Sequence, residues 1–286
     1  MSNLDIEQFW KDEETAHKDN CFSKEAKQVA LGIRMSGECV FAELGEEGEP
    51  WGYTPPQRRL ELNKRYNEKA LKTVGIKLLG ENPPMPEDSN LPHYREIGEV
   101  FGGEYIFDGK TTWLQGSLHG EKELEKKLDE IDKLDLREFI LPKNWEEKKK
   151  YVFEKYGKMP REFSDIRGPV TLAMSVYGTE DLIFLLYDAP ELAARFSDTI
   201  ANVIIGYYDI FQVEAGKKPE EASRGFSFRD DNCALLNPEL YEMFGYPILK
   251  KVFDHCASAP GAKRYQHSDS AMEHLLPILA PCTILH

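Results

Sequence analysis

The sequence predicts an α/β protein built as a (β/α)8 barrel, the TIM-barrel architecture. Short apolar runs that end in a polar residue alternate with amphipathic helical segments, which is typical of parallel βαβ units. The competing Rossmann and P-loop sheets carry signatures that this chain lacks, a Gly-x-Gly-x-x-Gly motif after the first strand and a Walker lysine loop. In a barrel the active site is assembled at the carboxyl ends of the strands.

Composition sets limits on the function. The chain has 286 residues, with 36 basic and 50 acidic side chains and a formal net charge of −14. Because a protein of such negative charge repels phosphate backbones and anionic lipids, we expect neither a nucleic-acid nor a membrane partner. Residues 1–10 lack a signal-peptide pattern, which predicts a cytoplasmic protein. The five cysteines are odd in number and lack Cys-x-x-Cys spacing, which predicts reduced thiols.

The first hundred residues contain two predicted helices and two predicted strands within a single domain, 1–286. A helix over residues 25–34, ending before Gly37, belongs to an N-terminal helical segment, 1–38. A charged amphipathic helix is predicted over residues 56–71. The apolar runs 39–44 and 74–79 are predicted strands, which bring Glu43 and Glu81 to strand ends.

Residues 101–150 are predicted to be an insertion made of a hairpin and a helix. Asp108-Gly109 lies between Tyr105-Ile106-Phe107 and Thr111-Thr112-Trp113, which favours a β-hairpin. Apolar residues then recur every three or four positions from Leu124 to Leu134, which indicates one face of a surface helix.

The pattern is most regular after residue 163. Strands are predicted over 163–167, 222–228 and 263–266, and each ends at polar residues. Gly168-Pro169 opens a segment that leads to Gly178. Helices are predicted to begin at Asp188-Ala189-Pro190 and at Asn237-Pro238, because proline is favoured in the first turn of a helix. We expect Pro247 to bend the last of these helices.

The strand ends supply the candidate catalytic residues. His267 and Asp269 are two apart, so both side chains can converge on a cation, with a third ligand from Glu43, Glu81 or a thiol. The alternative is a histidine that only hydrogen-bonds a neighbouring carboxylate. Asp230 or Asp231 can handle a proton or stabilise positive charge, or can simply accept hydrogen bonds from turn amides.

Arg167, which is also a catalytic candidate at a strand end, and three aromatic residues are the candidate binding groups. Arg167 can anchor an anion or can pair with Asp165. Trp51, Tyr53 and Trp113 can stack on a planar ligand or can pin their loops to the core. We include Glu43 and Glu81 among the candidate substrate-binding residues because they follow predicted strands.

Several motifs in order resemble the uroporphyrinogen decarboxylase (URO-D) superfamily. Gly168–Ala173 resembles its Gly-x-Pro-x-Thr-Leu-Ala element, and His267–Ser270 looks like its His-x-Asp-Gly or His-x-Cys-Gly element. The intervening similarities are Asp188–Glu191, Gln212–Gly216, Asp230-Asp231 and Asn237–Tyr241, followed by Pro247 and Lys250. The resemblance covers roughly residues 163–270 and implies a modified (β/α)8 barrel.

The resemblance implies one of two chemistries. The decarboxylases use no metal; an Arg-Gln-Ala-Gly-Arg motif holds the substrate carboxylates, and a Phe-Ser-Asp element lies at the second strand. Here the first region reads Ile33–Glu38, and Phe163-Ser164-Asp165 belongs to a later strand. We therefore expect the other chemistry, methyl transfer between a small methylated substrate and a cobamide, free or on a corrinoid protein. His267 and Asp269 would then be zinc ligands.

Two alternatives to this function stay open, porphyrinogen decarboxylation and a non-catalytic subunit that binds a corrinoid or tetrapyrrole. Superfamily members continue for about two more βα units beyond the His-x-Asp element. Five or six barrel strands are predicted here, so the barrel closes differently, a homodimer covers the gap, or the sequence is a fragment.

Overall fold

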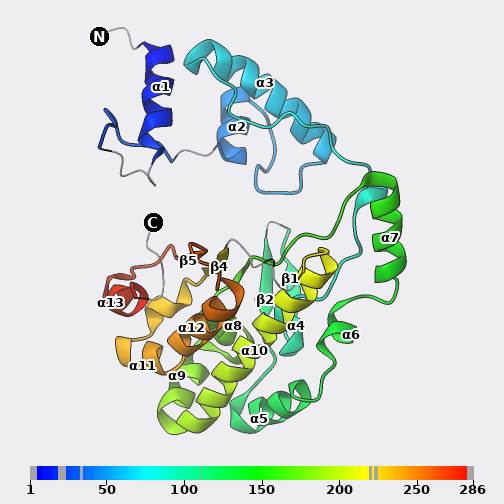
Figure 1. Ribbon diagram of the computed structural model, residues 1–286, viewed down its shortest axis with the longest axis vertical. Coiled ribbons are helices and arrows are strands. Elements are labelled where there is room, and N and C mark those ends of the chain that lie inside the picture. The colour runs from blue at the N-terminus through cyan, green and yellow to red at the C-terminus, as the bar shows by residue number, and fades with distance from the viewer. Residues whose placement is uncertain are drawn as a thin grey trace. The chain divides into compact units, whose positions relative to one another are not determined.

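The computed structural model describes residues 5–18, 24–32, 35–109, 111–218, 221 and 225–281 (Figure 1). The chain divides into two compact units: Met1–Pro86 with Phe107–Thr111, and Glu87–Ile106 with Thr112–Leu285. The single domain over 1–286 stays a prediction. The described cysteines Cys39, Cys233 and Cys256 form no disulfide.

The protein is a mixed α/β structure. The first unit holds helices α1 (Ile6–Ala16), α2 (Gly37–Leu44) and α3 (Pro56–Val74). The second begins with η2 (Glu87–Ser89), α4 (Ile97–Val100), β1 (Glu104–Phe107), β2 (Thr112–Gln115), α5 (Gly120–Ile131), α6 (Leu136–Ile140) and α7 (Trp145–Tyr156). It continues with β3 (Asp165–Arg167), α8 (Pro169–Tyr177), α9 (Thr179–Asp188), α10 (Pro190–Glu214), β4 (Gly225–Arg229), η3 (Asn232–Leu235), α11 (Pro238–Met243), α12 (Gly245–Cys256), β5 (Lys263–His267), η4 (Glu273–Leu275) and α13 (Leu276–Leu279).

A three-stranded parallel sheet organises the second unit. Its order is β3-β4-β5, with Arg167 opposite Arg229 and Arg229 opposite His267. Phe226 and Phe228 of β4 are buried among the helices. The three strands predicted after residue 163 are thereby confirmed, to within a few residues at their ends.

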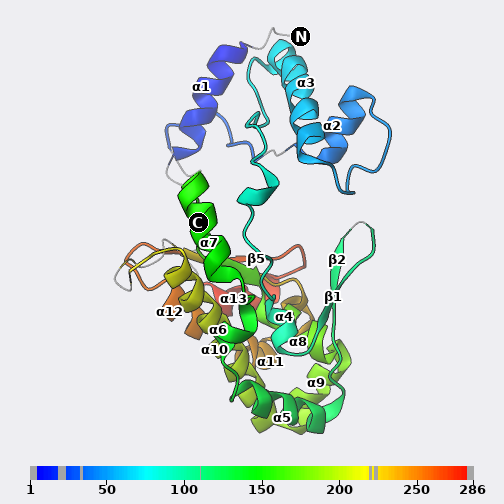
Figure 2. The same ribbon diagram turned by 90° about the vertical axis from the view of Figure 1, so that its right-hand side faces the viewer.

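Helix α10 is the longest cover of this core and packs against both α12 and α5 (Figures 1 and 2). Pro190 occupies its first turn, where a backbone N–H would have no acceptor within the helix, so the N–H that proline lacks is not needed there. Phe196, Ile200 and Ile204 recur every four residues and are fully buried, which fixes the face that α10 turns to the core.

Residues 101–150 contain the predicted hairpin and helix, and their being an insertion stays a prediction. β1 pairs with β2 around Asp108 and Gly109, and Gly109 has φ +95°, a conformation that favours glycine. The amide of Thr111 donates to Oδ1 of Asp108 at 2.8 Å, which closes the turn. Leu124 and Leu128 are the buried residues of α5, as the spacing predicts.

The predicted strand at 39–44 is wrong, because these residues lie in helix α2. Ser36 caps this helix by accepting a hydrogen bond from the amide of Cys39 at 3.3 Å. Gly45 ends it in the left-handed conformation, at φ +64°. Glu43 therefore lies on a helix and not at the end of a barrel strand.

The predicted strand at 74–79 is also wrong. α3 extends through Val74 and ends at Gly75, at φ +76°. The amides of Leu78 and Leu79 donate to Oδ1 of Asn67, both at 3.0 Å. The acceptor for these backbone N–H groups is therefore a side chain and not the backbone of a neighbouring strand. The helix prediction over 56–71 is confirmed.

A helix over 25–34 is not found in its described part, residues 25–32. Instead, the amide of Leu31 donates to Oε1 of Glu13 at 2.7 Å, and Gln28 donates to Oε2 of Glu13. These hydrogen bonds hold the segment against helix α1, which contains Glu13.

Within the described residues, the parallel sheet has three strands, and a closed (β/α)8 barrel is not seen there. The bend expected at Pro247 is a break at Phe244 between α11 and α12, and Pro247 lies in the first turn of α12. None of the described helices is by itself long and apolar enough to cross a membrane. α8 and α9 reach that length and composition only together, bent by 102°.

Candidate functional site

The carboxyl ends of the three parallel strands meet at one edge of the sheet. The register aligns Arg167, Arg229 and His267, the last residues of β3, β4 and β5. Asp230 and Asp231 follow β4 directly. In parallel α/β proteins this edge is where ligands bind, and the structure places four of the predicted site residues beside it.

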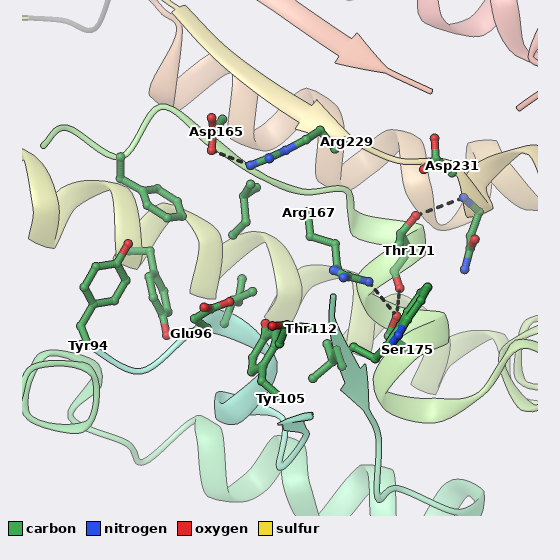
Figure 3. Close-up of a pocket in the computed structure, with 17 residues that line it drawn as sticks. Tyr94, Glu96, Tyr105, Thr112, Asp165, Arg167, Thr171, Ser175, Arg229 and Asp231 are labelled. Carbon is green, nitrogen blue, oxygen red and sulfur yellow. Dashed lines mark hydrogen bonds and ion pairs between the residues drawn. The ribbon is translucent and has the colours of Figure 1, made fainter. Parts of the chain in front are cut away.

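A cavity of about 740 Å³ opens beside β3 and the end of β4 (Figure 3). The sheet edge and α8 contribute Phe163, Asp165, Ile166, Arg167, Thr171, Ser175, Arg229, Asp231 and Asn232 to its lining. Preceding segments and α10 contribute Tyr94, Glu96, Ile97, Tyr105, Thr112, Trp113, Leu114 and Tyr207. A cavity of this size suits a small organic ligand.

Two arginines line this cavity in different electrostatic states. Arg229 is paired with Asp165, Nη2 to Oδ1 at 2.7 Å. Arg167 is half-buried and donates to Oγ of Ser175 at 3.3 Å. Among the described residues no carboxylate forms an ion pair with Arg167, so the pairing with Asp165 that the sequence left open is not the one formed. A half-buried guanidinium that forms no ion pair with the described carboxylates can bind an anion.

Asp230 is fully buried and lies behind the cavity, not on its lining. Its Oδ1 accepts from the amide and the hydroxyl of Thr171, both at 2.8 Å, and its Oδ2 accepts from the amide of Val170 at 3.3 Å. The carboxylate thus caps the first turn of α8, whose free N–H groups favour an anion. Burial nevertheless raises the pKa of Asp230 to about 6.

Gly168 is needed for Asp230 to approach the start of α8. A Cβ on residue 168 would lie 2.0 Å from Cβ of Asp230, well inside van der Waals contact. The Gly-Pro pair therefore does two things: glycine admits the carboxylate, and Pro169 begins the helix. That role is structural, and a proton-handling role for Asp230 stays a prediction.

Asp231 faces the cavity and joins the ends of β4 and β5. Its Oδ1 accepts from the amide of Asp269 at 2.7 Å. The adjacent amide of Asn232 donates to the hydroxyl oxygen of Thr171 at 3.1 Å. Figure 3 shows Thr171 and Asp231 together at one end of the cavity, with Tyr94 at the other. Asp231 is thus held by the backbone while its second oxygen remains available to a ligand.

His267 and Asp269 contact each other, with Nε2 3.2 Å from Oδ1. Neither residue lines the cavity, and Asp269 is 83% exposed. In the described part of the chain, no group of three His, Cys, Asp or Glu side chains is placed to hold a metal ion. This part therefore does not fit a three-ligand zinc site, and zinc stays a prediction from the resemblance. Cys21 and Cys282 lie outside the described residues.

Two neutral phenols, Tyr105 and Tyr207, belong to the lining of the cavity. Burial and the nearby charge of Glu96 raise the pKa of Tyr105 to about 12. Burial also raises the pKa of Tyr207, whose hydroxyl donates to the carbonyl of Arg95 at 2.8 Å. These phenols keep their protons at neutral pH. The hydroxyl of Tyr105 accepts from the amide of Gly98 at 3.3 Å and is hydrogen-bonded to Glu96.

The structure places the remaining predicted binding residues unevenly. Trp113 of β2 lines the cavity. Glu43, Glu81, Trp51 and Tyr53 belong to the other compact unit, and the cavity lining includes none of them. Glu43 pairs with Lys69, Glu81 with Lys77, and the indole of Trp51 donates to Glu38.

Sequence reasoning missed several lining residues. Ser175 lies one helical turn after Thr171, a spacing that indicates a shared face once α8 is recognised. Tyr105 and Thr112 flank the hairpin turn, but nothing in the local sequence indicates that β2 packs against α8. Tyr207 lies in the apolar stripe of α10, where its hydroxyl gave no separate signal.

Comparison with known proteins now identifies the family. The family model for uroporphyrinogen decarboxylase (URO-D) matches residues 121–284, more than half of the chain. The chain belongs to the URO-D family. The match covers the parallel sheet, α8 and α10, and it contains most of the cavity lining.

No curated protein matches this URO-D family chain significantly. Among solved structures, a methyltransferase from Methanosarcina mazei is similar at a TM-score of 0.44 and 16% sequence identity. The similarity covers 87% of this chain and 66% of the methyltransferase, so the chain spans just under two thirds of that protein's length.

Proposed function

We propose that this URO-D family protein transfers a methyl group between a small anionic substrate and a cobamide. The observation that carries the proposal is the charge of the cavity. Its lining holds Glu96, Asp165 and Asp231 against Arg167 and Arg229, and Arg229 is already paired. One free guanidinium suits one anionic group, whereas a porphyrinogen with eight carboxylates would meet a net acidic wall.

Each role follows from the geometry of the lining. Arg167 anchors the anionic group of the substrate and is itself oriented by Ser175. When a methyl group leaves without its bonding electrons, the donor heteroatom keeps the electron pair and becomes more basic. The O–H of Tyr105, which is hydrogen-bonded to Glu96, can turn to donate a hydrogen bond to that atom, and Asp231 can hold a proton or balance positive charge there.

The cobamide is proposed from the sequence motifs. The chain lacks the Arg-Gln-Ala-Gly-Arg and second-strand Phe-Ser-Asp elements of the decarboxylases, while its His267–Asp269 element resembles the one that both branches share. The partner would be a corrinoid protein or a free cobamide. We also propose that the β3-β4-β5 sheet is a section of a URO-D-type barrel, supported by its parallel order and by the polar residues at its carboxyl edge.

The test is steady-state methyl transfer to reduced cobalamin from a panel of methylated carboxylates, followed by cobalamin absorbance. Arg167→Gln removes the charge and leaves a shorter, neutral side chain that still donates hydrogen bonds. We expect this change to raise KM about tenfold or more, because a charge-assisted bidentate contact is lost, and to change kcat less.

The matched variant is Arg229→Gln, because Arg229 lines the same cavity but already has a carboxylate partner. Its KM should change less than that of Arg167→Gln. Equal effects of the two substitutions would show that Arg167 is not the anchor. Carbon dioxide release from uroporphyrinogen, without methyl transfer, would overturn the proposed reaction itself.

A further inference from the structure

A second cavity adjoins the first and is used by no step proposed above. Its volume is about 650 Å³, close to that of the first. Tyr94, Phe163 and Asp165 line both cavities and so form the wall between them. In Figure 3, Tyr94 and Asp165 lie at the end of the first cavity that is away from Ser175.

The wall of the second cavity is an aromatic cluster that its neighbours hold in place. Tyr94 packs on Phe211 with ring centroids 4.5 Å apart and edge-on to Trp145 at 6.5 Å. Phe163 stacks on Phe211 at 6.0 Å. Trp145 and Phe211 are almost fully buried, whereas Tyr94 and Phe163 keep part of their surface accessible. A flat apolar ligand would therefore meet preformed ring surface.

The charge that faces this cavity is positive, in a chain whose net charge is −14. Its two carboxylates already have partners: Glu162 pairs with Lys217 at 2.9 Å, and Asp165 pairs with Arg229.

The basic side chains of the lining are His93, Lys158 and Arg161. Lys158 donates to the carbonyl of Ser89 at 3.1 Å, and among the described residues none of the three basic groups forms an ion pair. The uncompensated charge is therefore cationic.

From this geometry we propose that the second cavity is a separate binding site for a small aromatic carboxylate. The ring system of the ligand lies against Tyr94 and Phe163. The carboxylate is held by Arg161, whose planar fork matches it, and by Lys158 as a point charge. The proposal does not rest on methyl transfer, since it uses neither Arg167 nor the carboxyl ends of the strands.

The test uses the full chain and 2-naphthoate as the probe, with binding followed by titration calorimetry. We expect saturable binding that Arg161→Gln weakens about tenfold, the scale of one charge-assisted hydrogen-bonding group. Lys158→Gln should weaken it in the same direction. The matched control is Arg59→Gln, which removes the same charge from an exposed position on the other compact unit and should leave affinity within about twofold.

Because the first cavity also contains an arginine, the titration is repeated with Arg167→Gln. Retained, Arg161-dependent binding in that variant supports the second site. Loss of binding in Arg167→Gln would place the probe in the first cavity and overturn the proposal. Equal effects of Arg161→Gln and Arg59→Gln would also overturn the proposal. The absence of saturable binding to the wild-type protein, with its folding checked by circular dichroism, would do the same. Methyl transfer enters none of these readouts, so its failure and the failure of this site are distinguishable.

Discussion

The unit that carries the two cavities and the unit formed by α1 to α3 bury very different amounts of apolar surface. In the unit that carries the cavities, one continuous cluster of buried apolar residues runs from Ile97 to Leu279 and surrounds the sheet. In the other, the main cluster of buried side chains is Val40, Leu62, Tyr66 and Ala70. Here a buried amide, Asn67, makes four hydrogen bonds that hold α3 to the segment after it.

This contrast shows where each unit derives its stability. Burial of apolar area drives folding in proportion to the area removed from water, so the sheet unit depends on packing. The smaller unit has less area to bury, so single polar contacts carry a larger share of its structure. The cavities therefore lie on the part of the molecule that is best able to hold side chains in fixed positions.

The largest effect is expected from Phe228→Ala in the sheet unit. Phe228 is fully buried and packs against Phe226 and Phe253, with ring centroids 5.3 and 5.2 Å away. The truncation should lower the free energy of unfolding by about 3–5 kcal/mol, measured by urea denaturation. Phe153→Ala, at a position 52% exposed on α7, is the control. If the two variants lose similar stability, packing does not dominate this unit.

An intermediate effect is expected from pH, through Asp230. Its folded pKa, about 6, exceeds the ordinary value of 3.8, so the folded state binds the proton more tightly than the unfolded chain does. Its contribution to stability is therefore fullest below pH 4 and is lost as pH rises through 6, by about 2–3 kcal/mol.

The stability difference between the wild type and Asp230→Asn isolates this contribution, because the amide does not titrate. The wild type should lose its relative stability between pH 4 and pH 7 in paired urea denaturation curves. A difference that stays constant across that range would show that Asp230 titrates normally.

The smallest of the three effects on stability is expected in the unit of α1 to α3. Asn67→Ala removes a fully buried amide and leaves the N–H groups of Leu78 and Leu79 without their acceptor, at a cost of about 1–3 kcal/mol. Asn63, on the same helix, makes one hydrogen bond, to the carbonyl of Gly80 at 2.8 Å. Asn63→Ala should therefore cost less than about 1 kcal/mol in the same denaturation experiment. Equal losses would remove the special role of the buried amide.

The two units also differ in how well their sequences predict them. In the sheet unit, apolar runs, proline starts and polar strand ends lie close together in sequence, so β3, β4, β5 and the helix starts could be predicted. In the other unit, the runs at 39–44 and 74–79 read as strands, but the cap at Ser36 and the distant Asn67 decide otherwise. A hydrogen bond from the backbone of one segment to a side chain of another is a tertiary contact, and a hydropathy pattern does not reveal it.

The candidate site shows the same division. The residues at strand ends, Arg167 and Asp231, could be predicted because topology alone brings them to one edge. Which of these residues face the cavity could not be predicted. The carboxylate of Asp230 accepts hydrogen bonds at the start of α8, while its neighbour Asp231 lines the cavity. The contribution of Tyr105 depends on how the hairpin packs against α8, and nothing in its local sequence indicates that packing.

The most direct test of the proposed function compares two reactions of the wild-type protein. Reduced cobalamin with methylated carboxylates is followed by absorbance, and uroporphyrinogen is followed by carbon dioxide release. We predict methylcobalamin formation that depends on Arg167, and no decarboxylation. Decarboxylation without methylation would contradict the account, and the absence of both reactions would favour a non-catalytic subunit that binds a corrinoid or tetrapyrrole.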